Sequence, residues 1–381
     1  MRYLAKQLVI LLLVSASLAG SLAMAQVLPE DRADVLYHSF DGDQIQITGP
    51  SILLRKKLTK DFSAYANLYI DSISSASIDV RSYASPYEEK RTEVSLGGDY
   101  LLGETILSGG VTSSDENDFE ARSAYFGISQ DIFGGLTTVR LGFARGWDKI
   151  GQVTDPSFEE EADRRSYRLG LSQVVTKNFI MTFDFEGITD EGFLNNPYRN
   201  VRFRDPTAPD GFLWQPEVYP ETRTSSAFSV GGRYFTKPGS AIYGSTRFFT
   251  DTWGVDAWDA SLGYTFSLER NWLFDVGYRY YTQGAADFYS DLFDYPDQQN
   301  FLARDKELST FSDQSLRFGV TYDMPVERWG FVKRGTANFN YDYILFKYDD
   351  FRDPTAGGVA GEEPLFDFTA DVLQLYVSFW F

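Results

Sequence analysis

Charged side chains recur at every second position in many segments of this chain. Between residues 90 and 102, Arg91 and Glu93 alternate with Val94 and Leu96. Successive side chains of a β-strand point to opposite faces, so this pattern predicts a strand with one charged and one apolar face. The same assignment along the chain predicts a set of charged residues that line a polar interior: Arg91, Glu93, Asp99, Arg140, Arg168, Asp184, Glu186, Arg233, Arg247, Asp259, Asp275, Arg279, Arg317 and Asp342.

The residue types that most hydrolytic sites require are nearly absent. His38 is the single histidine and the chain has no cysteine, so Ser-His and Cys-His pairs and the usual zinc sites lack bases and ligands. Asp184 and Glu186 share one strand face, a spacing that suits acid–base catalysis. On strands already rich in charge, however, this spacing arises without function. We predict that the protein is not an enzyme and holds no cofactor.

Two acidic runs contain the oxygen ligands that calcium prefers, Asp115-Glu-Asn-Asp118 and Glu159-Glu-Glu161. Neither run has the ligand spacing and the glycine of a dedicated calcium loop. We therefore expect solvated loop carboxylates there rather than a metal site.

The chain is acidic, with a formal net charge of −19. Its acidic residues gather in the segments predicted to be long loops, whereas short turns such as Thr59-Lys60-Asp61 and Lys177-Asn178 carry lysines. Nucleic acid is excluded as a partner, because its phosphates require a basic surface. An acidic rim attracts cations instead.

The last stretch, Asp371 to Phe381, alternates without a break, with Leu373, Leu375 and Val377 on one face. About ten residues of this pattern suffice to cross a bilayer as a tilted strand. A strand that ends on an aromatic residue is typical of the closing strand of bacterial outer-membrane barrels. There the terminal residue, here Phe381, is the signal for the barrel-insertion machinery.

The first 25 residues have the organisation of an export signal. Arg2 and Lys6 precede an apolar run, and Ala23-Met24-Ala25 provides a cleavage site of small residues. We expect residues 1–25 to be removed and residues 26–381 to form a single outer-membrane β-barrel domain, in contact with lipid and lipopolysaccharide.

The number of strands follows from the alternating segments. Fifteen are clear, the first near residues 44–58, and a chain with both ends in the periplasm requires an even number. Ala33 to Phe40, followed by Asp41-Gly42-Asp43, supplies the missing strand. The sequence therefore predicts an all-β fold, a transmembrane antiparallel up-and-down β-barrel of sixteen strands, or fourteen if the first hairpin lies outside it. The expected connections alternate between short turns and long segments, which include 75–89, 148–163, 189–224 and 283–311.

Longer motifs are distributed over nearly all of the chain after the leader: Ile78-Asp-Val80, Ala84-Ser-Pro-Tyr87, Asp155-Pro156, Asp163-Arg-Arg-Ser-Tyr-Arg-Leu-Gly-Leu-Ser-Gln173, Ile188-Thr-Asp-Glu-Gly-Phe-Leu-Asn-Asn-Pro-Tyr-Arg199, Arg247-Phe-Phe-Thr-Asp-Thr-Trp-Gly254, Tyr278-Arg-Tyr-Tyr-Thr-Gln283 and Ala286-Asp-Phe-Tyr-Ser-Asp-Leu-Phe293. In these motifs the sequence resembles an outer-membrane family described only as a domain of unknown function. The resemblance implies the fold and the location in the bacterial outer membrane. It implies no activity, no binding residues and no particular periplasmic partner.

Two functions fit these features. The first is porin-like passage of small solutes through a polar lumen, with an acidic outer mouth that favours cations. The second is a non-conducting scaffold or receptor, in which ion pairs and the 189–224 loop fill the lumen.

Overall fold

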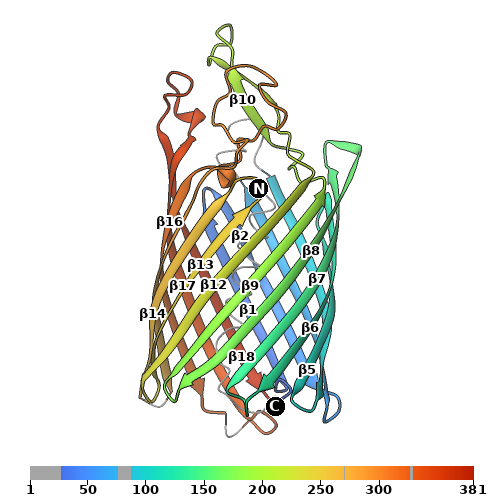
Figure 1. Cartoon of the computed structure of the whole chain (residues 1–381), viewed down its shortest axis with the longest axis vertical. Coiled ribbons are helices and arrows are strands. Elements are labelled where there is room, and N and C mark those ends of the chain that lie inside the picture. Colours follow the sequence, from blue (N-terminus) through green and yellow to red (C-terminus); the bar gives the residue numbers. More distant parts are fainter. Residues whose placement is uncertain (1–26, 76–86, 270, 327–328) are drawn as a thin grey trace.

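The computed structural model describes residues 27–75, 87–269, 271–326 and 329–381, and it contains a closed antiparallel barrel of sixteen strands (Figure 1). The predicted leader and the motifs Ile78-Asp-Val80 and Ala84-Ser-Pro86 lie outside the described residues. The barrel strands are β1 (Arg32–Gly42), β2 (Ile45–Lys57), β3 (Phe62–Ser75), β4 (Tyr87–Leu102), β5 (Thr105–Asp115), β6 (Phe119–Ile132), β7 (Thr137–Gln152), β8 (Asp155–Thr176), β9 (Phe179–Gly192), β12 (Thr222–Lys237), β13 (Ser240–Asp251), β14 (Asp256–Leu268), β15 (Trp272–Gln283), β16 (Phe311–Met324), β17 (Arg334–Arg352) and β18 (Leu365–Trp380).

The first strand closes the barrel. β1 pairs with β2 on one side and with β18 on the other, along its whole length from Arg32 to Gly42. The prediction of sixteen strands is thus confirmed, and the fallback of fourteen is wrong because the weak first hairpin belongs to the wall. Asp43 and Gln44 form the two-residue turn to β2 with φ values of 51° and 55°, as a tight hairpin turn requires.

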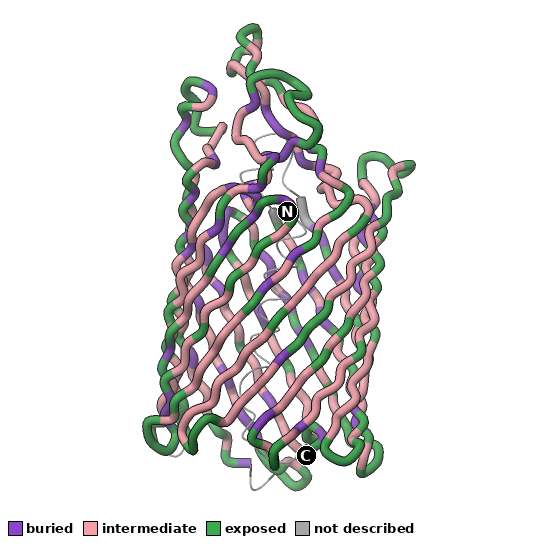
Figure 2. Tube along the Cα trace, in the orientation of Figure 1, coloured by how far each residue is buried: buried purple, intermediate pink, exposed green. Residues whose placement is uncertain are grey.

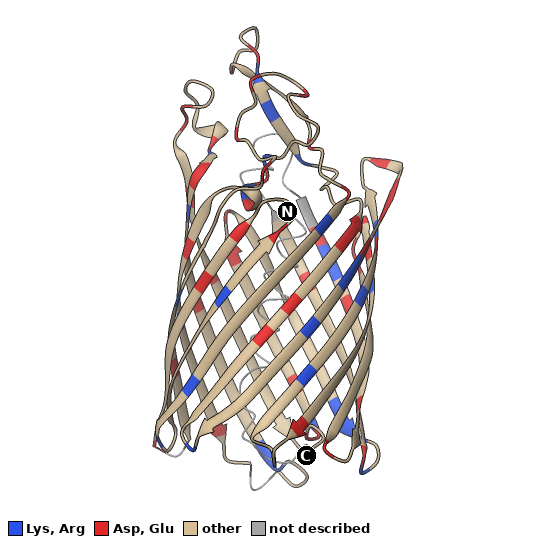
Figure 3. Cartoon of the chain, viewed as in Figure 1, with Lys and Arg blue, Asp and Glu red and all other residues tan. Residues whose placement is uncertain are grey.

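The two faces of the wall differ as the alternation predicts. Large apolar side chains project from the outer face, among them Leu96, Phe248 and Leu262, which is 63% exposed. Figure 2 shows mixed exposure along the strands, and Figure 3 shows charged positions scattered along them. No helix in the described part of the chain is long and apolar enough to cross a membrane.

The connections at the two ends of the barrel differ in length. At one end are short turns such as 103–104, 177–178 and 238–239. At the other end are the segments 193–221, 284–310 and 353–364, and the first of these contains the hairpin of β10 (Asn200–Arg204) and β11 (Phe212–Pro216). Figure 1 shows β10 in a cap beyond the barrel wall. Two short 3-10 helices, η1 (Lys306–Leu308) and η2 (Pro354–Ala356), lie in the other two segments.

Two predicted loop boundaries need correction. The segment 148–163 is no loop, because β7 and β8 stay paired through Asp148↔Ala162 as far as Gln152↔Asp155, and their alternation continues beyond the wall. The 189–224 loop is shorter than predicted, since β9 reaches Gly192 and β12 begins at Thr222.

The outer apolar face makes a depth-dependent prediction. Leu262, at the middle of β14, and Leu268, at its end, lie on the same outward face. Leu262→Arg should lower the free energy of unfolding from lipid vesicles by about 2–4 kcal/mol, and Leu268→Arg by about 0–1 kcal/mol. Urea titration of folded protein in vesicles measures both, and equal losses would contradict a lipid-facing β14.

Candidate functional site: the lumen wall and the capped mouth

Ion pairs join adjacent strands, or strands separated by one other strand, across the inward face of part of the wall. They connect predicted lumen residues on β7 to β9 and on β13 to β17, on the side opposite the exposed apolar residues. The N–O separations are Arg140–Asp184 3.9 Å, Arg168–Glu186 2.8 Å, Arg247–Glu186 3.4 Å, Arg279–Asp259 3.6 Å, Arg279–Asp313 3.3 Å and Arg317–Asp342 2.7 Å. Asp313 was not among the predicted residues, although it lies four residues before Arg317 on the same face of β16.

The remaining predicted lumen residues lie on the same face with other partners. Arg233 stacks over the Tyr243 ring at 5.1 Å. The Tyr243 hydroxyl donates to Asp275 at 2.7 Å, and Thr265 donates to the same carboxylate at 2.6 Å. A Cβ at Gly263 would lie 2.2 Å from the Tyr243 ring, so glycine is required there for Tyr243 to lie flat against β14.

The predicted residues on β4 also lie in hydrogen-bonded groups. Asp99 accepts from Ser108 at 2.6 Å and pairs with Arg55. Glu93 faces Tyr69 in the register of β3 and β4. The inward charges therefore support the wall, and those with exposed guanidinium groups also face the lumen.

Most of these arginines are more exposed than the carboxylates they pair with. The side chain of Arg317 is 40% exposed and that of Asp342 is 7% exposed, and Arg168 and Glu186 differ in the same direction. Arg140 and Asp184 are the exception. The wall thus presents guanidinium N–H donors to the lumen and holds most of the carboxylates behind them, which suits contact with polar solutes.

The single histidine forms part of a buried polar cluster at the inner wall. His38 Nε2 lies 2.7 Å from Asp71 and 3.0 Å from the Tyr69 hydroxyl, and its ring stacks on Tyr69. Arg91 pairs with the other oxygen of Asp71 at 3.0 Å. Among the described residues, no Ser or Thr hydroxyl lies within hydrogen-bond distance of His38, so the His–Asp pair has no nucleophile beside it.

The inward face is not polar throughout. Near the capped end, β1 and β16 to β18 direct a cluster of aromatic side chains inward, and Tyr289 of the 284–310 segment packs against it. The polar lumen that the charged residues predict is therefore interrupted at this level by an apolar zone. The cluster contains Phe346, Tyr348, Phe351, Phe366 and Phe368.

Two segments lie across the mouth at this end. In the ring of strands, the β9–β12 junction lies opposite the β1–β2 turn, and the β15–β16 junction lies opposite the β5–β6 turn, with eight strands on each side. From the first junction, Tyr198 reaches Asp118 in the β5–β6 turn. From the second, Lys306 reaches Asp43 in the β1–β2 turn.

The same two segments also contact each other. Arg199 pairs with Asp305, and Val218 and Leu302 form an antiparallel bridge with an N–O distance of 2.7 Å. The two junctions and the two turns lie four strands apart around the rim, and these contacts connect all four. We conclude that the segments 193–221 and 284–310 cap the opening.

Charged groups hold the cap together in its interior. Arg202 is fully buried, pairs with Asp291 and Glu363, and stacks over Phe212 at 5.1 Å. Arg304, almost as buried, bonds to Asp291 at 3.0 Å. These contacts join the 193–221, 284–310 and 353–364 segments. Asp291 and Asp305 are thus ion-pair partners within the cap.

Glu217 is a buried carboxyl at the centre of this cap. It accepts from the Tyr219 hydroxyl at 2.7 Å and from the Arg304 backbone N–H at 2.7 Å. Burial raises the pKa of Glu217 to about 7, since nearby Asp305 adds to the effect of burial and Arg199 opposes it. Burial and Asp305 raise the pKa of neighbouring Glu307 as well.

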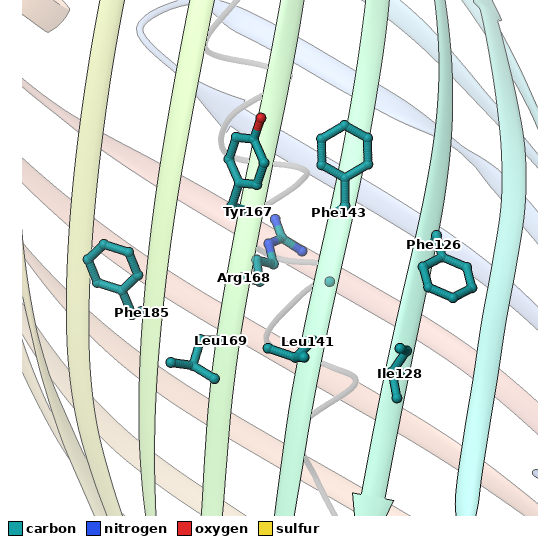
Figure 4. A pocket seen from close by; sticks show the side chains of 9 residues that line it. Phe126, Ile128, Leu141, Phe143, Tyr167, Arg168, Leu169 and Phe185 are labelled. Carbon is teal, nitrogen blue, oxygen red and sulfur yellow. The ribbon is translucent and has the colours of Figure 1, made fainter.

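A hollow of about 320 Å³ lies elsewhere, on the outer face of β6 to β9 (Figure 4). Its lining includes outward apolar side chains such as Phe126, Phe143 and Tyr167. It therefore belongs to the apolar outer surface and not to the lumen. In the described part of the chain, no three Asp, Glu or His side chains gather closely enough to hold a metal ion, and this includes the acidic runs at 115–118 and 159–161.

The buried arginine in the cap gives a stability prediction. Arg202→Ala would leave Asp291 and Glu363 without their main partner, so the cap should lose about 3–5 kcal/mol of local stability. Arg204→Ala, two residues away and half exposed, should cost about 0–1 kcal/mol. The rate of proteolytic cleavage within residues 193–221 measures the difference, and equal rates for the two variants would refute a cap held by Arg202.

The raised pKa of Glu217 makes the cap sensitive to pH. A carboxyl whose pKa is raised by folding contributes stability that is complete below its unfolded value near 4.5 and is lost as pH rises through about 7. Proteolysis of the cap should therefore be faster at pH 8 than at pH 5, relative to Glu217→Gln measured at the same pH. A constant ratio of the two rates across this range would show that Glu217 does not titrate in the cap.

Comparison with known proteins agrees with the barrel architecture. A bacterial polysaccharide outer membrane secretin has a TM-score of 0.50 and 8% identity, with 93% of this chain and 99% of that chain covered. The siderophore receptor PirA from Pseudomonas aeruginosa has a TM-score of 0.44 and 11% identity. The match covers 84% of this chain but 57% of the receptor, so the chain spans little more than half of that protein. The CymD monoaromatic hydrocarbon channel has a TM-score of 0.44 and 9% identity, with coverages of 94% and 90%.

The likeness to the secretin supports the fold alone. No curated protein matches the sequence. The family model described as "Protein of unknown function (DUF3570)" matches residues 76–365, which is most of the chain. The chain therefore belongs to the DUF3570 family.

Proposed function

We propose that this protein is a gated passage for small polar solutes in the bacterial outer membrane. The observation that carries the proposal is the capped lumen, since two segments rooted on one side of the rim make their end contacts on the other. A barrel of sixteen strands is wide enough to leave an aqueous channel. Its inward arginines supply hydrogen-bond donors along that channel.

The proposal includes a preference for cations. Many acidic residues of the cap and of the β7–β8 hairpin remain exposed after the buried pairs are made: Glu159, Glu160, Glu161, Asp210, Asp294, Asp297 and Glu362. Carboxylates at a pore entrance raise the local concentration of cations. The guanidinium groups deeper in the lumen are mostly paired with carboxylates. Their positive charge therefore offsets the negative potential of the entrance only in part.

A non-conducting scaffold or receptor is the second candidate. The observation that favours it is the burial of Arg202 and Arg304, which are 0% and 2% exposed. Such buried pairs suit a permanent closure as well as a gate. The two candidates differ in whether the cap ever opens.

Location and processing are part of the same proposal. Residues 1–25 direct export and are removed, residues 26–381 insert as one barrel, and the strand ending at Phe381 is read by the insertion machinery. Lipid and lipopolysaccharide surround the apolar outer face, and no nucleic acid or cofactor is involved.

Planar-bilayer recording of the folded protein tests the passage. We expect brief openings of the intact barrel, and a steady and larger conductance after residues 194–220 are replaced by a short Gly-Ser linker, because one of the two segments that cap the mouth is then missing. Under a salt gradient, the reversal potential should show cation preference. Heat-dependent migration on gels checks that each variant retains the barrel.

Each outcome separates the candidates. A folded intact protein that never opens, together with a shortened variant that conducts, would favour the scaffold. Silence from both folded proteins would refute passage altogether, and anion preference would refute the role of the acidic mouth.

A further inference from the structure

The Lys306 side chain of η1 lies in a pocket built by other parts of the barrel. Its ammonium group pairs with the Asp43 carboxylate, and both side chains are 4% exposed. The same ammonium lies 5.3 Å from the centre of the Phe368 ring and 5.8 Å from that of Phe366. One carboxylate and two aromatic faces therefore surround a primary ammonium ion.

The pocket belongs to the barrel and not to the segment that fills it. Asp43 lies in the two-residue turn between β1 and β2, and its φ of 51° is fixed by that turn. Phe366 and Phe368 project inward from β18, which pairs with β1 along its length. The ring centroids of Phe366 and Phe368 lie 5.7 Å apart with the rings tilted, and Phe368 stacks parallel to Phe346 at 4.5 Å. The pocket thus remains in place if Lys306 leaves.

We propose that Asp43, Phe366 and Phe368 form a binding site for primary alkylammonium ions, which Lys306 occupies when the mouth is capped. A lysine side chain is itself a butylammonium ion tethered to the backbone, so its position shows which chemistry the pocket accepts. Aromatic faces attract ammonium ions through their quadrupoles, more strongly when water is excluded. The carboxylate supplies the charge-assisted hydrogen bond that fixes the ammonium group.

Displacement of Lys306 releases the cap at one of its outer attachments. Lys306 follows Asp305, which pairs with Arg199 of the 193–221 segment. A free amine that takes the pocket therefore removes the contact between the 284–310 segment and the β1–β2 turn. This step rests on the proposed gated passage, and it identifies organic amines as solutes that open their own path.

The tethered lysine sets the concentration at which a free amine competes. A group linked through a short segment has an effective concentration on the order of millimolar or above. The free ion must exceed this value in the intact protein, but not in a variant without the lysine. The test therefore compares Lys306→Ala with the unmodified barrel.

Binding is measured by saturation-transfer NMR with n-butylammonium chloride, against sodium chloride at equal ionic strength. Lys306→Ala should bind at about a tenfold lower concentration than the unmodified protein. Lys306→Ala combined with Asp43→Asn should lose this gain, while Lys149→Ala, which removes an exposed lysine, should behave as unmodified. Equal binding by Lys306→Ala and the unmodified barrel, or binding that is insensitive to Asp43→Asn, would overturn the site.

Opening is measured separately by conductance. Lys306→Ala and Lys306→Met, which keeps most of the side-chain volume, should both open more often than the unmodified barrel. n-Butylammonium should raise the open fraction of the unmodified barrel and not of Lys306→Ala. Binding without any conductance in all variants would refute the passage and leave the site standing. Conductance that is unaffected by either substitution at Lys306 would refute the role of the Lys306–Asp43 contact in holding the cap.

Discussion

Every feature of this molecule depends on the pairing of β1 with both β18 and β2. A strand within a bilayer must satisfy its backbone N–H and C=O groups without water, and only a closed ring does so for every strand. Closure directs one face of each strand outward and the other inward. Val94 and Leu96 therefore face outward, and Arg91 and Glu93 face the interior. The charged set then has to lie in the interior, where isolated charges are costly. Cross-strand pairs such as Arg317–Asp342 offset that cost.

The same electrostatic reasoning explains the cap, with a different outcome. In the lumen, guanidinium groups remain partly in contact with the interior space, so their pairs brace the wall at modest cost. In the cap, Arg202 and Arg304 are removed from solvent altogether. Arg202 has two carboxylates and an aromatic face, whereas Arg304 has Asp291, backbone carbonyls and aromatic faces. Since a buried pair adds little stability when complete but costs much when broken, the cap is held in one arrangement and has few intermediate ones. This is a property expected of a two-state gate and of a permanent closure alike.

Periodicity predicted the wall well because the alternation of residues within each strand identifies its inward and outward faces. The fifteen clear strands and the inward positions of Arg140, Arg247 and Asp259 follow from a period of two, whereas the weak first strand follows from the even strand number that a chain with both ends in the periplasm requires. Periodicity failed where contacts join residues far apart in sequence. Arg202 pairs with Glu363, 161 residues away in sequence, and Lys306 pairs with Asp43, 263 residues away. The spacing of residues within either segment does not predict which distant residue it contacts. The inward aromatic cluster was missed for another reason. The period of two already places Phe366 and Phe368 on the face opposite Leu373 and Leu375, but only charged residues were assigned to that inward face.

The inward position of these rings is informative about the lumen. A wet interior favours polar side chains, so inward rings need a partner that covers them. Tyr289 and the Lys306 ammonium group provide that cover, and both come from the segment that crosses the mouth. The cap therefore covers part of the apolar inner surface, and withdrawal of the 284–310 segment exposes aromatic faces to water inside the barrel. The cost of that exposure favours the capped state, and any ligand that opens the mouth must cover the rings in its place.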